Sequence, residues 1–110
     1  MTIPFKIPRS VMCGATKYTV TRHTSKTDKE IAGCYGYCMA DKAKIVLDRR
    51  LSGEVARKTL EHEVGHATLA ESGAQYILSK FIEDPQALHE LEECLIRIWL
   101  PSYQASIGSF

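Results

Sequence analysis

The sequence of 110 residues lacks any long apolar run, any strong excess of charge, and any repeat or low-complexity tract. Without roughly 20 consecutive apolar residues, no segment is expected to cross a bilayer as a helix. The formal net charge is only +1 with both signs interspersed, so we expect no nucleic-acid or membrane partner. The length suits a single domain spanning residues 1–110 and built on one hydrophobic core.

Secretory features are also missing. The opening stretch, MTIPFKIPRSVMCGATKY, has no apolar segment of leader length, which favours a cytoplasmic location. In that reducing compartment the four cysteines, Cys13, Cys34, Cys38 and Cys94, are expected to stay reduced. Cys34 and Cys38 are spaced C-x-x-x-C, one residue longer than the usual metal or redox pair, so a packing role is favoured.

Strand-like stretches occupy the first half of the chain. Residues 17–22, KYTVTR, alternate and are rich in residues that favour strands. After a polar, loop-like stretch at 23–33 come YGYCM and KIVLD, and the ADKA between them is a plausible hairpin connection. The sequence therefore predicts a small antiparallel sheet of about three strands.

Helical signals follow in the second half, which makes the predicted fold class α+β. One helix is expected over residues 52–72, with Ser52 as its N-cap and Gly73 as its stop. A second is expected over residues 85–100, because Asp84-Pro85 is a typical helix start and Pro101 a typical end. Residues 74–83 fit either a short helix or an ordered loop. We expect the sheet to pack on both predicted helices.

The first predicted helix contains His62-Glu63-Val64-Gly65-His66, an H-E-x-x-H motif. Its two histidines lie one turn apart on one face, where both rings could bind one Zn²⁺ at about 2.0–2.1 Å. Glu63 is rotated about 100° from His62 and could act as general base toward a metal-activated water. Gly65 weakens a helix by roughly 0.5–1 kcal/mol, which suggests a close approach to its backbone. Alternatively, these residues could form a polar stripe on the helix without any metal. However, packing alone would favour Leu or Ala over two titratable histidine rings at these positions.

A catalytic zinc needs a third protein ligand and one open position. The metzincin extension of the motif would require Gly at 69 and His at 72, whereas this chain has Leu69 and Ser72. The third ligand is therefore expected from the second predicted helix.

That helix offers several acidic residues and a histidine. Five apolar residues mark its predicted buried side: Leu88, Leu91, Leu95, Ile98 and Trp99. A ligand held by a packed helix should lie at the margin of the core, and Glu92 occupies that margin. Glu92 is thus the first choice for the third zinc ligand, followed by Glu93 and then His89.

With these residues identified, the sequence resembles small phage-type zinc metallopeptidases of the gluzincin kind. These include the minigluzincins and the ImmA/IrrE-type peptidases, which cleave phage and mobile-element repressors. The resemblance lies in three blocks within residues 35–101: YGYCMADKAKIVLD, LSGEVARKTLEHEVGHATL and EECLIRIWLP. In that family, small or apolar residues follow the ligand glutamate at +3, +6 and +7. Counted from Glu92, these positions hold Leu95, Ile98 and Trp99, whereas Ile96 replaces the family's frequent Asn or Asp at +4.

The resemblance implies zinc-dependent hydrolysis of a peptide bond in a protein or peptide substrate, with Glu63 as general base. It also implies that an outer strand, residues 35–40 or 44–48, pairs with an extended peptide. The alternative is a zinc-stabilised binding or regulatory module without catalysis. For a residue that stabilises the oxyanion, the sequence offers Tyr76, Tyr103 and His23 without distinguishing among them.

Overall fold

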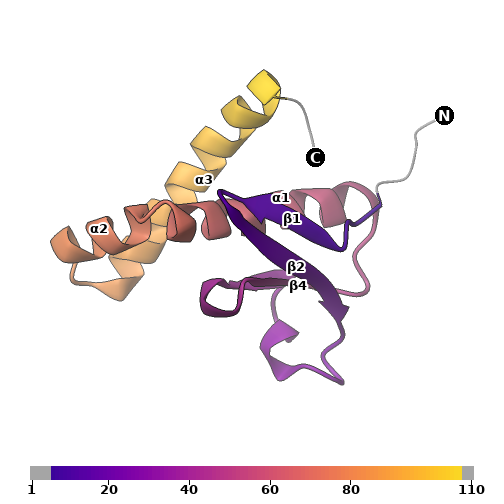
Figure 1. Cartoon of the computed structure of the whole chain (residues 1–110). Coiled ribbons are helices and arrows are strands. Elements are labelled where there is room, and N and C mark those ends of the chain that lie inside the picture. Colours follow the sequence, from indigo (N-terminus) through magenta and orange to yellow (C-terminus); the bar gives the residue numbers. More distant parts are fainter. Residues whose placement is uncertain (1–5, 108–110) are drawn as a thin grey trace.

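The computed structural model describes the backbone of residues 6–107 and the side chains of residues 6–97. The chain is α+β, with one sheet lying against α1, while α2 and α3 gather near the C-terminal end of α1 (Figure 1). In chain order the elements are β1 (Ser10–Cys13), β2 (Thr16–His23), η1 (Lys29–Ile31), β3 (Gly36–Met39), η2 (Ala40–Lys42), β4 (Lys44–Asp48), α1 (Gly53–Glu71), α2 (Ala74–Phe81) and α3 (Pro85–Ile107).

The sheet has four strands in the order β1-β2-β4-β3, and it is mixed rather than antiparallel. The predicted hairpin is present, because β3 and β4 pair antiparallel. However, β2 and β4 pair in parallel, with Val20 opposite Ile45. The chain reverses direction at β3 on the outside of the sheet and returns as β4 through its middle, which brings β4 alongside β2 in the same direction. The prediction of about three antiparallel strands is corrected accordingly.

Strand β4 forms the centre of the core. It coincides with the predicted KIVLD stretch, and Ile45, Val46 and Leu47 are each 0% exposed. Ile45 and Leu47 belong to one buried cluster with Leu60 of α1. Val46 points to the opposite face of the strand, so β4 is covered on both faces, as expected for an interior strand with a continuous apolar run.

Helix α1 spans 19 residues and agrees with the predicted range to within one residue at each end. Ser52 occupies the N-cap position, although its side chain makes no capping hydrogen bond. The chain turns out of the helix at Gly73, whose φ of 79° lies in the left-handed region that glycine adopts without strain. Residues 74–81 then form α2, so the short helix is correct and the loop alternative is not.

Helix α3 starts at Pro85 as predicted, and the backbone N–H of Gln86 donates to Asp84 Oδ1 at 3.1 Å. It does not end before Pro101 but continues to Ile107. The fixed φ of proline lies near the helical value, so a helix can run through it. The missing backbone N–H and the ring cost the helix about 3 kcal/mol. No helix within residues 6–107 combines the length and the apolar character needed to cross a membrane.

Candidate metal centre

The two histidines of the motif converge on one carboxylate of α3. His62 Nε2 lies 3.0 Å from Glu93 Oε2, and His66 Nε2 lies 2.9 Å from Glu93 Oε1. One potential ligand atom from each residue falls within 4.8 Å of the other two. The i, i+4 spacing places both rings on one side of α1, and the packing of α3 brings Glu93 opposite them. Two imidazoles and one carboxylate at this spacing could hold a metal ion.

Glu92, the first choice from the sequence, lies elsewhere. It is only 4% exposed, and its Oε1 accepts a hydrogen bond from Gln75 Nε2 at 2.8 Å. Its Oε2 faces the other nitrogen of His66, with 3.9 Å between Oε2 and Nδ1. The geometry therefore favours Glu93, the second choice, as the third ligand.

The difference comes from the rotation of α3 about its axis. Leu95, expected on the buried side, is 38% exposed, whereas Ile96 is only 3% exposed. The buried face is thus turned by about one residue from the predicted stripe, and its margin moves from Glu92 to Glu93. The side chains of Ile98 and Trp99, which completed the predicted stripe, lie outside the described residues.

Ile96 of α3 packs closely against Gly65 of α1. A Cβ added at Gly65 would lie 2.9 Å from Ile96 Cγ2, closer than two carbon atoms normally approach. Any larger residue at 65 would therefore push the helices apart unless Ile96 shifted. The prediction that something approaches Gly65 closely is confirmed.

His89, the third choice, lies at the rim of the site. Its ring stacks on that of His66, with centroids 6.0 Å apart and planes 5° from parallel. Its Nε2 is 3.6 Å from Glu93 Oε1, and its side chain is 58% exposed. His89 is therefore a neighbour of the three converging residues rather than a member of that group.

Glu63 is buried beside the histidines, with 7% of its surface exposed. Burial raises the pKa of its carboxyl group to about 7, and the nearby charge of Glu93 adds to this effect. A carboxyl group that titrates near neutral pH can accept a proton and return it, which is the property that a general base and acid requires.

The charge states of the surrounding groups suit a cation. Burial lowers the pKa of His66, and the neighbouring His62 lowers it further, which favours a neutral ring with a free lone pair. Burial alone would raise the pKa of Glu93, but His62 and His66 outweigh it and the pKa is lowered. A neutral imidazole and an ionised carboxylate are ligands that Zn²⁺ accepts.

A cleft of about 720 Å³ gives access to these residues. One wall is formed by β3 and η2, and the other carries the two histidines, Glu63 and Glu93. Cys34 and Cys38 also line it, but neither belongs to the three converging residues. Burial raises the pKa of Cys38 to about 12, so its thiol stays protonated and is a poor ligand. Within residues 6–97, the cysteines are unpaired.

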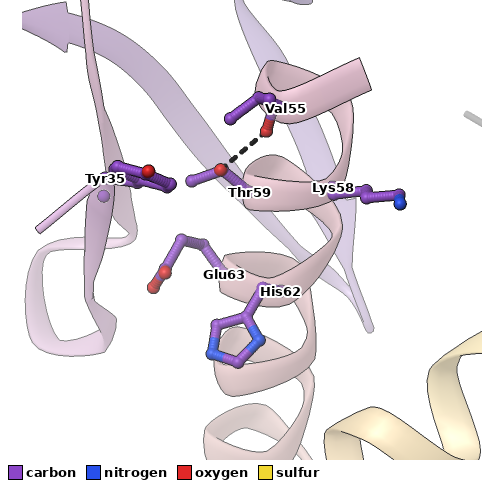
Figure 2. Close-up of a pocket in the computed structure, with 7 residues that line it drawn as sticks. Tyr35, Val55, Lys58, Thr59, His62 and Glu63 are labelled. Carbon is purple, nitrogen blue, oxygen red and sulfur yellow. Dashed lines mark hydrogen bonds between the residues drawn. The ribbon is translucent and has the colours of Figure 1, made fainter. Parts of the chain in front are cut away.

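A smaller pocket of about 450 Å³ adjoins the cleft and shares His62 and Glu63 with it. It lies between the start of β3 and the first turns of α1 (Figure 2). The Thr59 hydroxyl donates to the Val55 carbonyl at 2.7 Å, so this hydroxyl is already bonded within the helix. Tyr35 and Val55 line the pocket and are 63% and 48% exposed, which gives it an apolar mouth.

Two of the three oxyanion candidates from the sequence, His23 and Tyr76, are not brought to the site. His23 Nδ1 lies 2.8 Å from Asp28 Oδ2 at the end of β2, and His23 does not line the cleft. Tyr76 does not line it either, and its ring lies 4.6 Å from Lys80 Nζ. The side chain of Tyr103 lies outside the described residues. His89, which the sequence offered only as a third-choice ligand, lines the cleft instead.

Comparisons with protein-family models, with curated proteins and with solved structures find no match for this chain.

Proposed function

We propose that the chain is a zinc-dependent peptidase with Glu63 as its general base. The observation that carries this proposal is the convergence of two histidine Nε2 atoms on the Glu93 carboxylate, beside a buried glutamate. An H-E-x-x-H helix alone offers two ligands, and Glu93 would supply the third. The proposed metal ligands are therefore His62, His66 and Glu93, in place of the set with Glu92.

Zinc held by these residues would polarise a peptide carbonyl and make a water molecule more acidic. Glu63 would take the proton of that water and later pass it to the leaving amine. Its burial and the nearby charge of Glu93 raise the pKa of its carboxyl group, which favours uptake of that proton.

The substrate class that best fits the cleft is an extended peptide. β3 is an edge strand next to the site, whereas β4 pairs with β2 on one side and β3 on the other. Of the two strands implied by the resemblance, only β3 can accept an added strand. The pocket lined by Tyr35 and Val55 would receive an apolar side chain of that peptide.

This proposal keeps the likeness to phage-type gluzincins, including the ImmA/IrrE-type peptidases, and infers a cytoplasmic protein substrate. Counted from Glu93, the +3, +6 and +7 positions hold Ile96, Trp99 and Leu100, which are as apolar as those counted from Glu92. The likeness is therefore compatible with either glutamate, and the distances favour Glu93.

The test is Glu63→Gln, which keeps the size of the side chain and removes the base. Zinc content, measured by elemental analysis, should equal that of the wild-type protein, while cleavage of a peptide library should stop. Glu54→Gln is the matched control, because Glu54 is an exposed glutamate of the same helix. Hydrolysis that persists in Glu63→Gln would exclude this mechanism.

A zinc-stabilised binding module is the second candidate, and the position of His89 favours it. Structural zinc sites have four protein ligands, and His89 Nε2 is 3.6 Å from the carboxylate that the other two histidines approach. If His89 filled the fourth position, no place would remain for substrate. Zinc binding without cleavage in the wild-type protein, together with a loss of one ligand in His89→Ala, would support this function instead.

A further inference from the structure

Glu92 is an acidic residue buried where three helices meet. It belongs to α3, it accepts the 2.8 Å hydrogen bond from Gln75 of α2, and it faces His66 of α1. A buried carboxylate is costly unless polar groups or charges surround it. Gln75 offers one donor to Oε1, whereas Oε2 lies 3.9 Å from His66 Nδ1 and Glu92 lines the cleft. Oε2 can therefore accept a second donor, and His66 is placed to provide it.

The two ring nitrogens of His66 face two different carboxylates. Nε2 lies 2.9 Å from Glu93 Oε1, and Nδ1 lies 3.9 Å from Glu92 Oε2. A neutral imidazole carries one proton, so a ring that gives its Nε2 lone pair to a metal carries that proton on Nδ1. In the metal-loaded protein the Nδ1–H of His66 would thus point toward Glu92.

We propose that Glu92 is a positioning residue for the metal centre. It accepts the Nδ1–H of His66 and so holds the ring with Nε2 toward the metal, while Gln75 holds Glu92 from α2. This inference rests on the proposed metal site. For a normal hydrogen bond, His66 Nδ1 and Glu92 Oε2 must come roughly 1 Å closer than their present 3.9 Å. A small rotation of either side chain would bring them to that distance.

The other histidine of the motif serves as an internal comparison. The side chain of His62 is 35% exposed, and within residues 6–97 no carboxylate forms an ion pair with its Nδ1. His62 is therefore oriented without a buried carboxylate, and the proposed role of Glu92 is specific to His66. This separates the proposal from a general electrostatic effect, which would act on both rings.

The experiment compares Glu92→Gln with Glu90→Gln. Glutamine keeps the size of the side chain and an oxygen for Gln75 but loses the carboxylate, and Glu90 is an exposed glutamate of the same helix. Zinc affinity is measured by competition with a chromogenic chelator, and the protonated ring nitrogen of each histidine by ¹H–¹⁵N NMR of the zinc-loaded protein. Glu92→Gln should weaken zinc binding roughly 10–100-fold without changing its stoichiometry.

The NMR result distinguishes positioning from a merely structural role. In Glu92→Gln the Nδ1–H signal of His66 should shift, while the signals of His62 stay in place. Glu90→Gln should match the wild-type protein in both measurements. Gln75→Ala should weaken zinc binding in the same direction but less, because it leaves the Glu92 carboxylate in place.

Two results would overturn the inference and leave the metal centre standing. One is an unchanged zinc affinity and an unchanged His66 signal in Glu92→Gln. The other is the loss of one protein ligand in Glu92→Gln, seen by X-ray absorption, which would make Glu92 a ligand itself. If Glu92→Gln does not fold, Gln75→Ala replaces it as the test, because Gln75 is exposed. Zinc affinity and the His66 signal are then measured in that variant, and no change in either would overturn the inference. A wild-type protein that binds no zinc would instead overturn the proposed function and this inference together.

Discussion

The two packed faces of α1 differ in what they bury. On the sheet side, Leu60 and Ala67 are 0% exposed and pack in one apolar cluster with Tyr18 and Ile45. On the α3 side, Gly65 meets Ile96, and Glu92 of α3 is only 4% exposed. The first face buries apolar side chains against one another, whereas the second places a carboxyl group out of water.

This difference separates the part of α1 that stabilises the fold from the part that forms the site. Burial of apolar surface contributes roughly 25 cal/mol per Å² and needs no bound partner. Buried carboxyl groups cost free energy unless a cation or hydrogen bonds offset them. We therefore expect the stability of the sheet side to be independent of metal and that of the α3 side to depend on it.

The largest effect is expected from Leu60→Ala, which leaves a cavity on the sheet side. The free energy of unfolding should fall by about 2–5 kcal/mol, as for other large-to-small substitutions in a core. Urea unfolding with and without zinc measures it, and the loss should be the same in both conditions. Val55→Ala, at a 48% exposed position of the same helix, is the control and should change stability little. A loss that disappears on adding zinc would contradict the separation of the two faces.

Zinc should act on the α3 side. At a free concentration of about 100 times its Kd, it should raise the free energy of unfolding by about 2.7 kcal/mol, provided that it binds only the folded chain. Glu93→Gln should remove this increment, because it removes the carboxylate that both histidines approach. Thermal or urea unfolding with and without a chelator measures the effect. The increment should persist in Glu90→Gln, and its survival in Glu93→Gln would exclude Glu93 as a ligand.

Gly65→Ala should have the smallest effect, because two terms oppose each other. Alanine favours the helix by roughly 0.5–1 kcal/mol, but its Cβ meets Ile96, and overpacking typically costs about 1–3 kcal/mol. We expect a net destabilisation of about 1 kcal/mol and weaker zinc binding, since α3 carries Glu93. Unfolding and zinc titration measure both.

A double-mutant cycle identifies the origin of this effect. In an Ile96→Ala background the added Cβ has room, so Gly65→Ala should become neutral or stabilising. An equal cost of Gly65→Ala in both backgrounds would place the strain elsewhere than at Ile96.

Local patterns predicted the elements but not all of their neighbours. The KIVLD strand and the helix from 53 to 71 follow from strand composition and helical spacing in short windows. The parallel pairing of β2 with β4 depends on the path of the chain through β3, which no window of sequence contains. The continuation of α3 past Pro101 was not predicted, because proline was expected to end the helix, whereas it only makes the helix less stable at that point.

The choice between Glu92 and Glu93 shows where pattern reasoning fails in the site. The expectation that a ligand lies at the margin of the core was reasonable, but the margin depends on the rotation of α3. Adjacent residues differ by about 100° around a helix, so a small error in the buried face exchanges one glutamate for the other. The apolar spacing of the family could not correct it, because that spacing fits both residues.

The sequence by itself determined that two histidines and a glutamate lie within one helix, because a spacing of four residues returns to the same face in any α-helix. It also predicted the strand at residues 44–48, but not its place in the middle of the sheet, since the same residues were offered as a possible outer strand. Only the tertiary structure decided which acidic residue meets the histidines. That choice depends on how α3 packs on α1, where Ile96 meets Gly65, two residues far apart in the chain. The same packing left Glu92 buried behind His66 and gave it a different partner.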